Sequence, residues 1–180
     1  MQYNSWLYLF PFLGGSLILY YLLPIKRRWI GLLFSSLLFY ILTMKSLVVV
    51  VLFTTAAIYL GARVIEQFNE TFKLKKKELD RAARKELKNK TTKKIRYVIA
   101  FLCFINFGIL FVTKYFNFFG ENINALFNAL HIPAQIPFLN IFLPLGISFY
   151  TLSAISYVTD VARGVCKIER NYLRLLLFLI

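Results

Sequence analysis

Long runs without a charged residue alternate along this chain with short charged clusters. No charge occurs from Met1 to Ile25, for example, and three basic residues follow at 26–28. A helix needs roughly 17 to 25 apolar residues to cross about 30 Å of hydrocarbon. A composition that is 59% hydrophobic and 18% aromatic is also too apolar for a globular surface in water. The pattern therefore predicts membrane-spanning helices in five apolar stretches: residues 5–23, 29–44, 46–62, 97–113 and 139–159.

The basic residues fall on alternate sides of these five predicted spans. Lys and Arg near the ends of spans favour the cytoplasmic side of a membrane. The predicted inner loops hold twenty Lys and Arg residues: three at 26–28, thirteen at 63–96 and four at 163–174. The predicted outer side holds only Lys45 and Lys114. The sequence therefore predicts an all-α polytopic transmembrane bundle of about five spans plus the start of a sixth. It is expected to be multi-pass in a cell membrane, with its N-terminus outside.

Most of the +14 net charge comes from the predicted basic cytoplasmic loop, residues 63–96. Acid–base pairs four residues apart, such as Glu86 and Lys90, favour a surface helix within it. Its basic residues fit contact with the lipid bilayer, since each contributes on the order of 1 kcal/mol near anionic headgroups. An acidic protein partner docking at Lys73–Arg96 is the alternative. No aromatic residue interleaves with those charges, so nucleic-acid binding is not expected.

No sequence motif for catalysis, metal binding or cofactor binding occurs in the chain. His131, the single histidine, lies in the stretch ALHIPAQIP without a carboxylate close in sequence, so it is interpreted as a loop residue and not as a catalytic base. Cys103 falls in a predicted span and Cys166 in a predicted inner loop, which predicts no disulfide. We therefore expect no catalytic residue, no metal site and no bound cofactor within these 180 residues.

The last predicted span carries many polar side chains. Wound at about 100° per residue, it brings Gly146, Tyr150, Ser153, Tyr157 and Asp160 onto one face, at spacings of four, three, four and three. Unpartnered hydroxyl and carboxylate groups are costly in lipid, so this face is expected against other helices or a water-filled cavity. Two interpretations stay open: polar contacts that hold helices together, and the wall of a substrate tunnel.

The same span contains the stretch LPLGISFYTLSAISYVTDVARG, residues 143–164. This stretch resembles the signature of the membrane-bound O-acyltransferase family, in the bacterial branch that includes alginate O-acetyltransferase. Upstream, KYFNFF at residues 114–119 resembles a second motif of that family, while Leu152, Ser153 and Ala162 depart from its pattern. The matching residues are Pro144, Gly146, Ile147, Ser148, Phe149, Ser156, Tyr157, Asp160, Val161, Arg163 and Gly164.

The resemblance implies a bacterial membrane enzyme that moves an acyl group, commonly acetyl, onto a hydroxyl of a polysaccharide or other envelope glycan. It also implies an acyl donor, acetyl-CoA or another acyl carrier, and an envelope acyltransfer partner protein. The family's catalytic histidine belongs to a later part of its chain, so this chain resembles the N-terminal portion. A non-enzymatic membrane scaffold or transporter subunit, with a basic loop that docks a partner, is the rival interpretation.

The chain ends in LLLFLI, six apolar residues after Arg174. They would rise only about 9 Å in a helix, so we expect a truncated sixth span. We predict that residues 1–180 alone transfer no acetyl group. An acetyl-transfer assay on this isolated segment checks the prediction, and turnover without any downstream sequence would contradict it.

Overall fold

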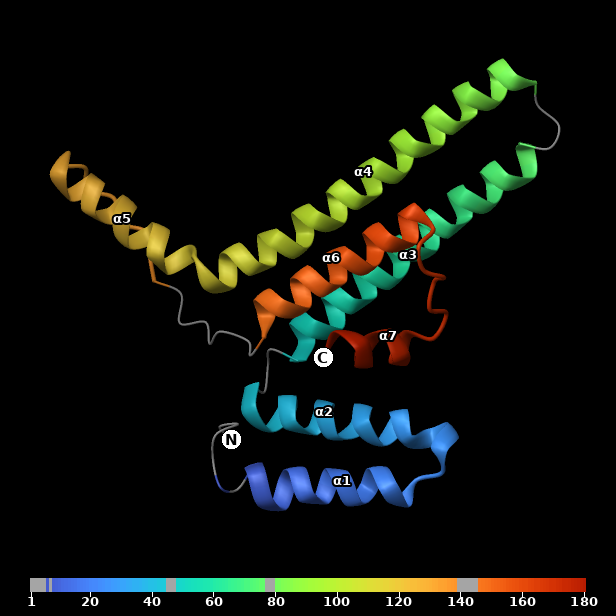
Figure 1. Cartoon of the computed structure of the whole chain (residues 1–180). Coiled ribbons are helices and arrows are strands. Elements are labelled where there is room, and N and C mark those ends of the chain that lie inside the picture. Colours follow the sequence, from blue (N-terminus) through green and yellow to red (C-terminus); the bar gives the residue numbers. More distant parts are fainter. Residues whose placement is uncertain (1–5, 7, 45–47, 77–79, 139–145) are drawn as a thin grey trace.

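The computed structural model describes residues 6, 8–44, 48–76, 80–138 and 146–180. These ranges contain helices and no strand, which confirms the predicted all-α class. Figure 1 shows the arrangement of the helices. In chain order the elements are a π-helical turn η1 (Tyr8–Phe12), α1 (Leu13–Leu22), a 3-10 turn η2 (Ile25–Arg27), α2 (Arg28–Met44), α3 (Val48–Lys75), α4 (Arg81–Lys114), α5 (Phe116–Ala129), α6 (Ile147–Arg163) and α7 (Tyr172–Leu179).

Three helices, α3, α4 and α6, pack against one another and form the body of the molecule (Figure 1). Gly61 of α3 is buried, and a side chain at that position would overlap Leu102 of α4, so the glycine lets the two helices approach closely. Close contact through small residues is a common way for helices to associate in lipid. The residues buried among α3, α4, α6 and α7 are Ile58, Ala62, Ile65, Ile95, Leu102, Ala154, Val158, Val161, Leu175 and Leu179.

A second buried cluster joins α2, α3, α6 and α7. Helix α7 contacts both α2 and α3 (Figure 1). Its Leu175 belongs to the first cluster and its Leu176 to the second. Helix α1 packs against α2. Helix α7 therefore connects the α1–α2 pair to the three-helix body. The second cluster consists of Leu33, Tyr40, Val51, Ile147, Tyr150 and Leu176.

Within the basic segment 63–96, where a surface helix is predicted, residues 63–75 and 81–96 form the ends of two long helices. Helix α3 continues as far as Lys75, and α4 begins at Arg81. The Asp80 side chain caps α4 by accepting a hydrogen bond from the Arg81 backbone N–H at 2.7 Å. Lys, Arg, Glu and Gln are strong helix formers. The helices therefore persist beyond the point where the sequence turns polar.

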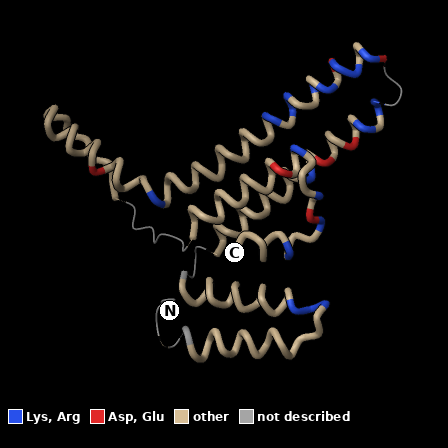
Figure 2. The backbone as a smooth tube through the Cα atoms, viewed as in Figure 1, with Lys and Arg blue, Asp and Glu red and all other residues tan. Residues whose placement is uncertain are grey.

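Charged residues gather at one end of the molecule, on the ends of α3 and α4, the turn between α1 and α2, and the segment after α6 (Figure 2). Helices α3 and α4 are each long and apolar enough to cross a membrane, and Phe10–Leu22 is a shorter apolar helix. The number of spans and the outer location of the N-terminus stay predictions. The predicted span 139–159 begins outside the described residues, and its helix α6 runs on to Arg163.

Replacing Gly61 with leucine should separate α3 from α4, because the new side chain would overlap Leu102. Overpacking of a buried contact typically costs about 1–3 kcal/mol of unfolding free energy. We expect Gly61→Leu to lower the unfolding midpoint of the detergent-solubilised protein in a thermal scan. Gly108→Leu on α4 is the matched control, because nothing lies within 4 Å of a Cβ added there. Equal midpoints for the two variants would contradict the close α3–α4 contact.

Candidate functional site

The polar face predicted on the last span belongs to α6 and divides between two environments. Ser153, Tyr157 and Asp160 are half-buried and line one pocket. Tyr150 is 4% exposed in the second buried cluster, and its hydroxyl has no hydrogen-bond partner among the described residues. Gly146 is exposed and precedes the helix with φ of +74°, a left-handed conformation that glycine adopts without strain. Three of the five predicted residues thus lie in one site.

The pocket has a volume of about 650 Å³ and lies between α6, α7 and the segment that joins them. Its polar groups are hydroxyls, a thiol and charges of both signs, and apolar side chains of α6 and α7 complete its wall. Apolar walls with a few convergent polar groups are typical of sites for small organic molecules. The lining residues are Leu152, Ser153, Ser156, Tyr157, Asp160, Cys166, Lys167, Glu169, Arg174, Leu175 and Phe178.

The chain reverses after α6 and returns beside it through the connecting segment, residues 164–171. Gly164 ends the helix with φ of +75°, and the next backbone N–H donates to the Asp160 carbonyl oxygen at 2.9 Å. This is a glycine-terminated helix end, which redirects the chain sharply. Further along, the Glu169 backbone N–H donates to the Tyr157 hydroxyl oxygen at 2.9 Å. These bonds hold the connecting segment against α6, where it forms one wall of the pocket.

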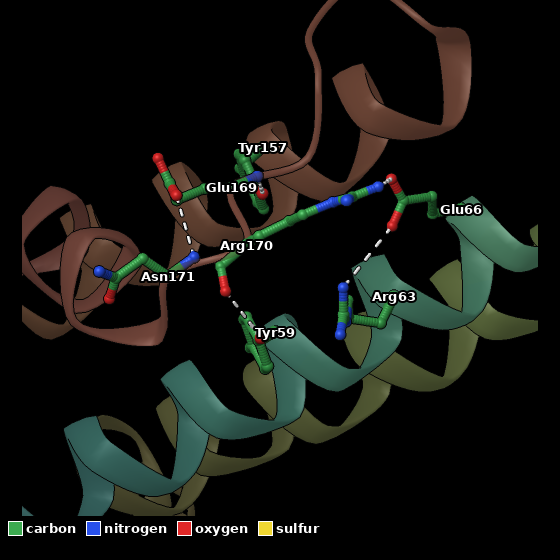
Figure 3. A network of polar contacts seen from close by, with 7 residues as sticks. All are labelled: Tyr59, Arg63, Glu66, Tyr157, Glu169, Arg170 and Asn171. Atoms are coloured by element: carbon green, nitrogen blue, oxygen red, sulfur yellow. Dashed lines mark hydrogen bonds and ion pairs between the residues drawn. The ribbon is translucent and has the colours of Figure 1, made fainter.

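Polar contacts also fasten the connecting segment to α3 (Figure 3). The Tyr59 hydroxyl donates to the Arg170 carbonyl oxygen at 3.0 Å. The Arg170 guanidinium lies 3.3 Å from one carboxylate oxygen of Glu66, and Arg63 lies 4.0 Å from the other. Exposed ion pairs contribute at most about 1 kcal/mol each. The network therefore acts mainly by fixing where the segment crosses α3.

Three further contacts orient α7, which forms the opposite wall of the pocket. The Asn171 side chain caps the helix by accepting a hydrogen bond from a backbone N–H of the first turn at 2.9 Å. The Tyr172 hydroxyl donates to the Leu52 carbonyl oxygen of α3 at 3.0 Å. The Arg174 guanidinium lies 5.3 Å from the centroid of the Trp29 ring on α2, within cation–π range. Contacts with α2 and α3 therefore hold α7 beside α6.

The two family-like motifs, distant in sequence, meet at the other end of α6. The Lys114 ammonium, from KYFNFF, donates to the Ser148 hydroxyl oxygen at 3.5 Å. Phe149 is 76% exposed on the outside of the helix. Pro144 lies outside the described residues. With Gly164 at the opposite helix end, the motif residues are spread along the whole of α6. Ser156, Tyr157 and Asp160 between these ends line the α6–α7 pocket.

Asp160 and Arg163 lie one turn apart on α6 but face different sides. Asp160 lines the pocket beside α7, and Arg163 lines a second pocket where α3, α4 and α6 meet. No ion pair joins them within the part of the chain that the structure describes. The end of α6 therefore presents a negative group to one pocket and a positive group to the other.

Sequence reasoning missed the part of the site that follows α6. Lys167, Glu169 and Arg174 line the pocket, although their stretch was predicted only as an inner loop and the start of a sixth span. The available signal was Gly164, a residue type that ends helices, followed shortly by Asn171, a residue type that begins them. A connection this short keeps consecutive helices adjacent.

The residues within the described ranges include no group of three His, Cys, Asp or Glu side chains placed to hold a metal ion. His131 is exposed in the turn after α5, with φ of +54°. The backbone beyond it is held by Asn124, whose Nδ2 donates to the Ile136 carbonyl oxygen at 3.0 Å and whose Oδ1 accepts from the Ile136 N–H at 2.7 Å. His131 therefore sits beside a structural turn and outside the lining of the α6–α7 pocket.

The long apolar helices and the charged end of the bundle are those of an all-α membrane protein. No family model matches the chain, and no solved structure matches it. Three proteins named probable alginate O-acetylase AlgI do match. Each is 38% identical to this chain, over 69 residues in Pseudomonas putida KT2440, 76 in Pseudomonas syringae pv. tomato DC3000 and 69 in Azotobacter vinelandii.

These matches cover 37%, 41% and 37% of this chain, and 14%, 13% and 13% of the respective relatives. The chain is therefore related to the alginate O-acetylases AlgI. It matches only a small part of the length of these relatives, so the relationship is established for a segment and not for a whole enzyme.

Burial raises the pKa of the Cys166 thiol, and the Asp160 carboxylate raises it further, because both disfavour the thiolate. Alkylating reagents attack the thiolate. In a Cys103→Ser background, Cys166 should therefore reach half its maximal iodoacetamide rate at a higher pH than a free cysteine, as followed by mass spectrometry. Asp160→Asn should shift this midpoint to lower pH, and the remote Glu121→Gln should not. An unchanged midpoint in Asp160→Asn would contradict the proximity of the two groups.

Proposed function

We propose that this chain is the N-terminal portion of a membrane O-acyltransferase that acetylates a hydroxyl of an envelope polysaccharide. The observation that carries the proposal is the match to three proteins named probable alginate O-acetylase. The apolar helices support a location in a membrane, and the bacterial source of the three matched proteins supports a bacterial cell membrane. Because the matches cover 13–14% of those relatives, the activity is proposed for the whole protein and not for these residues alone.

The proposed reaction moves an acetyl group from its donor to a hydroxyl oxygen. The bond between the acetyl carbonyl carbon and the leaving atom of the donor breaks, an ester bond to the acceptor oxygen forms, and the hydroxyl proton ends on the leaving group. A general base beside the acceptor hydroxyl accelerates such a step by taking its proton in the transition state. The resemblance assigns that base to a histidine beyond this chain, and His131 is not proposed for it.

The pocket between α6 and α7 is proposed as part of the wall on the donor side. Lys167 and Arg174 offer positive charge to a phosphate-bearing donor, such as acetyl-CoA or another acyl carrier. Leu175 and Phe178 offer apolar surface to the rest of the donor. The connecting segment belongs to the charged end of the molecule (Figure 2), which the predicted topology assigns to the cytoplasm. An envelope acyltransfer partner would act with this protein on the acceptor.

A non-enzymatic scaffold is the second candidate, because α3 and α4 extend beyond α6 (Figure 1) and carry many of the charges (Figure 2). In that case an acidic protein would dock at Lys73–Arg96. Pull-down of a purified acidic carrier protein with and without the basic residues of that segment distinguishes the two candidates. Charge-dependent capture together with an absence of acetyl transfer by the intact protein would favour the scaffold.

The enzymatic proposal is tested on the protein produced from its own gene, in membranes of its own host. Labelled acetyl-CoA and alginate are supplied, and acetyl ester on the polysaccharide is measured by its release with mild alkali. Ester formation that disappears when the gene is deleted supports the proposal. Equal ester formation with and without the gene, for alginate and for the host's own envelope polysaccharide, would overturn it.

Asp160→Asn and Tyr157→Phe should each lower acetyl transfer by the whole protein about tenfold. Each removes a polar group that borders the pocket, and a loss of about 1.4 kcal/mol of transition-state stabilisation is tenfold in rate. Glu121→Gln is the matched control, because Glu121 is exposed on α5 and does not line the pocket. The ratio kcat/KM is compared at equal protein in the membranes. Unchanged kcat/KM values for both pocket variants would show that this pocket takes no part in acyl transfer.

A further inference from the structure

A second pocket, of about 470 Å³, lies where α3, α4 and α6 meet. Three cationic side chains line it: Lys88 and Arg96 from α4, and Arg163 from the end of α6. No Asp or Glu of the described ranges is part of its lining. The pocket is therefore a positively charged groove between three helices, with its three cationic side chains exposed, in contrast to the α6–α7 pocket with its charges of both signs.

These three cations are not engaged by acidic side chains elsewhere in the described chain. The ion pairs there use Glu66 and Glu86, and none of them involves a cation of this pocket. Asp160 is close in sequence to Arg163 but lines the other pocket. Cationic side chains that line one pocket without an acidic partner attract an anion. The pocket is therefore suited to a negatively charged group.

Neutral hydrogen-bonding groups accompany the cations. Thr91 and Thr92 of α4 and Asn69 of α3 line the same pocket. Phosphate oxygens accept charge-assisted hydrogen bonds from Lys and Arg, and the planar guanidinium of Arg presents two parallel donors to a phosphate. Two arginines, a lysine and hydroxyl groups, without a carboxylate, match a phosphate group more closely than a metal ion or an uncharged ligand.

The rest of the lining is partly apolar, with Phe72, Ile95 and Ile99 in the wall. Arg96 is also the last charged residue of α4 before the uncharged run 97–113. The pocket therefore lies at the level where the helix changes from polar to apolar. A phosphate that carries acyl chains can contact both the polar and the apolar side chains of this lining, whereas a free phosphate can contact only the polar ones.

We propose that this pocket binds the phosphate headgroup of an anionic phospholipid such as phosphatidylglycerol. The proposal rests on the location in a membrane and not on acyl transfer. Basic pockets between transmembrane helices on the cytoplasmic side are a recurring type of site for anionic lipid headgroups. Arg96 and Arg163 bind the phosphate from two different helices, and the acyl chains continue along the apolar part of α4. A bound lipid thereby holds α4 and α6 together at their charged ends.

The test titrates the intact, delipidated protein in detergent with phosphatidylglycerol and follows the bound lipid by native mass spectrometry. Arg163→Gln should raise the dissociation constant about tenfold, since one charge-assisted phosphate contact is lost. Adding Lys88→Gln and Arg96→Gln should abolish specific binding. Arg163→Lys should bind more tightly than Arg163→Gln, because it keeps the charge. Circular dichroism verifies that each variant retains its helices.

The matched control is the triple variant Arg81→Gln, Lys85→Gln and Lys93→Gln, which removes the same charge from α4 outside the pocket. It should change the dissociation constant less than about threefold in physiological salt, where distant charges are screened. Phosphatidylethanolamine, which has no net charge, should bind more weakly than phosphatidylglycerol. Equal losses in the two triple variants, or equal binding of the two lipids, would overturn the proposal.

Competition experiments distinguish the lipid from other anions. Inorganic phosphate and an aspartate-rich peptide, each at the lipid concentration, should leave phosphatidylglycerol bound. Displacement by inorganic phosphate would assign the pocket to a free anion, and displacement by the peptide would assign it to an acidic protein; either result overturns the lipid proposal. None of these measurements uses acetyl transfer, so a failure of the proposed enzymatic activity does not affect their outcome.

Discussion

Hydroxyl groups on apolar helices must find hydrogen-bond partners without bulk water, and the length of the side chain decides where the partner lies. Short hydroxyl side chains reach the carbonyl of the preceding turn of their own helix. Thr55 donates to the Val51 carbonyl at 2.7 Å, and Thr159 donates to the Ile155 carbonyl at 2.8 Å. The hydroxyl groups of these residues are thus hydrogen-bonded within their own helix and need no partner on another segment.

A tyrosine hydroxyl lies too far from its own backbone for such a bond, so it needs a partner on another segment. Tyr59, Tyr157 and Tyr172 each form one with a backbone group across the structure, and every one of these bonds involves the connecting segment or α7. The α6–α7 pocket therefore depends on three phenol groups that extend from helices and fix the returning chain. Tyr150 carries the same group into the second buried cluster, where no described residue pairs with it.

Local periodicity sufficed to predict that the polar side chains of α6 share a face, because helix spacing fixes that relationship. It was insufficient to separate Tyr150, in the core, from Ser153 and Tyr157, in the pocket, because that division depends on where α7 packs. A surface helix was predicted within residues 63–96, but its unbroken continuation from the apolar part of α3 was not, for a different reason. Hydropathy shows which part of a helix lies in lipid, not where the helix ends. The backbone of α3 stays helical as far as Lys75 because its polar side chains also favour helix.

Helix α6 divides two cavities of different electrostatic character, and its last turn explains how they remain distinct. In the pocket beside α7, the acidic residues Asp160 and Glu169 balance Lys167 and Arg174. Arg163 instead adds to the excess of positive charge among α3, α4 and α6. If Asp160 and Arg163 formed an ion pair with each other, the difference in charge between the two pockets would be lost. Gly164 follows at once and reverses the chain. The two pockets therefore share the last turn of α6, with Asp160 lining one and Arg163 the other, immediately before the connecting segment begins.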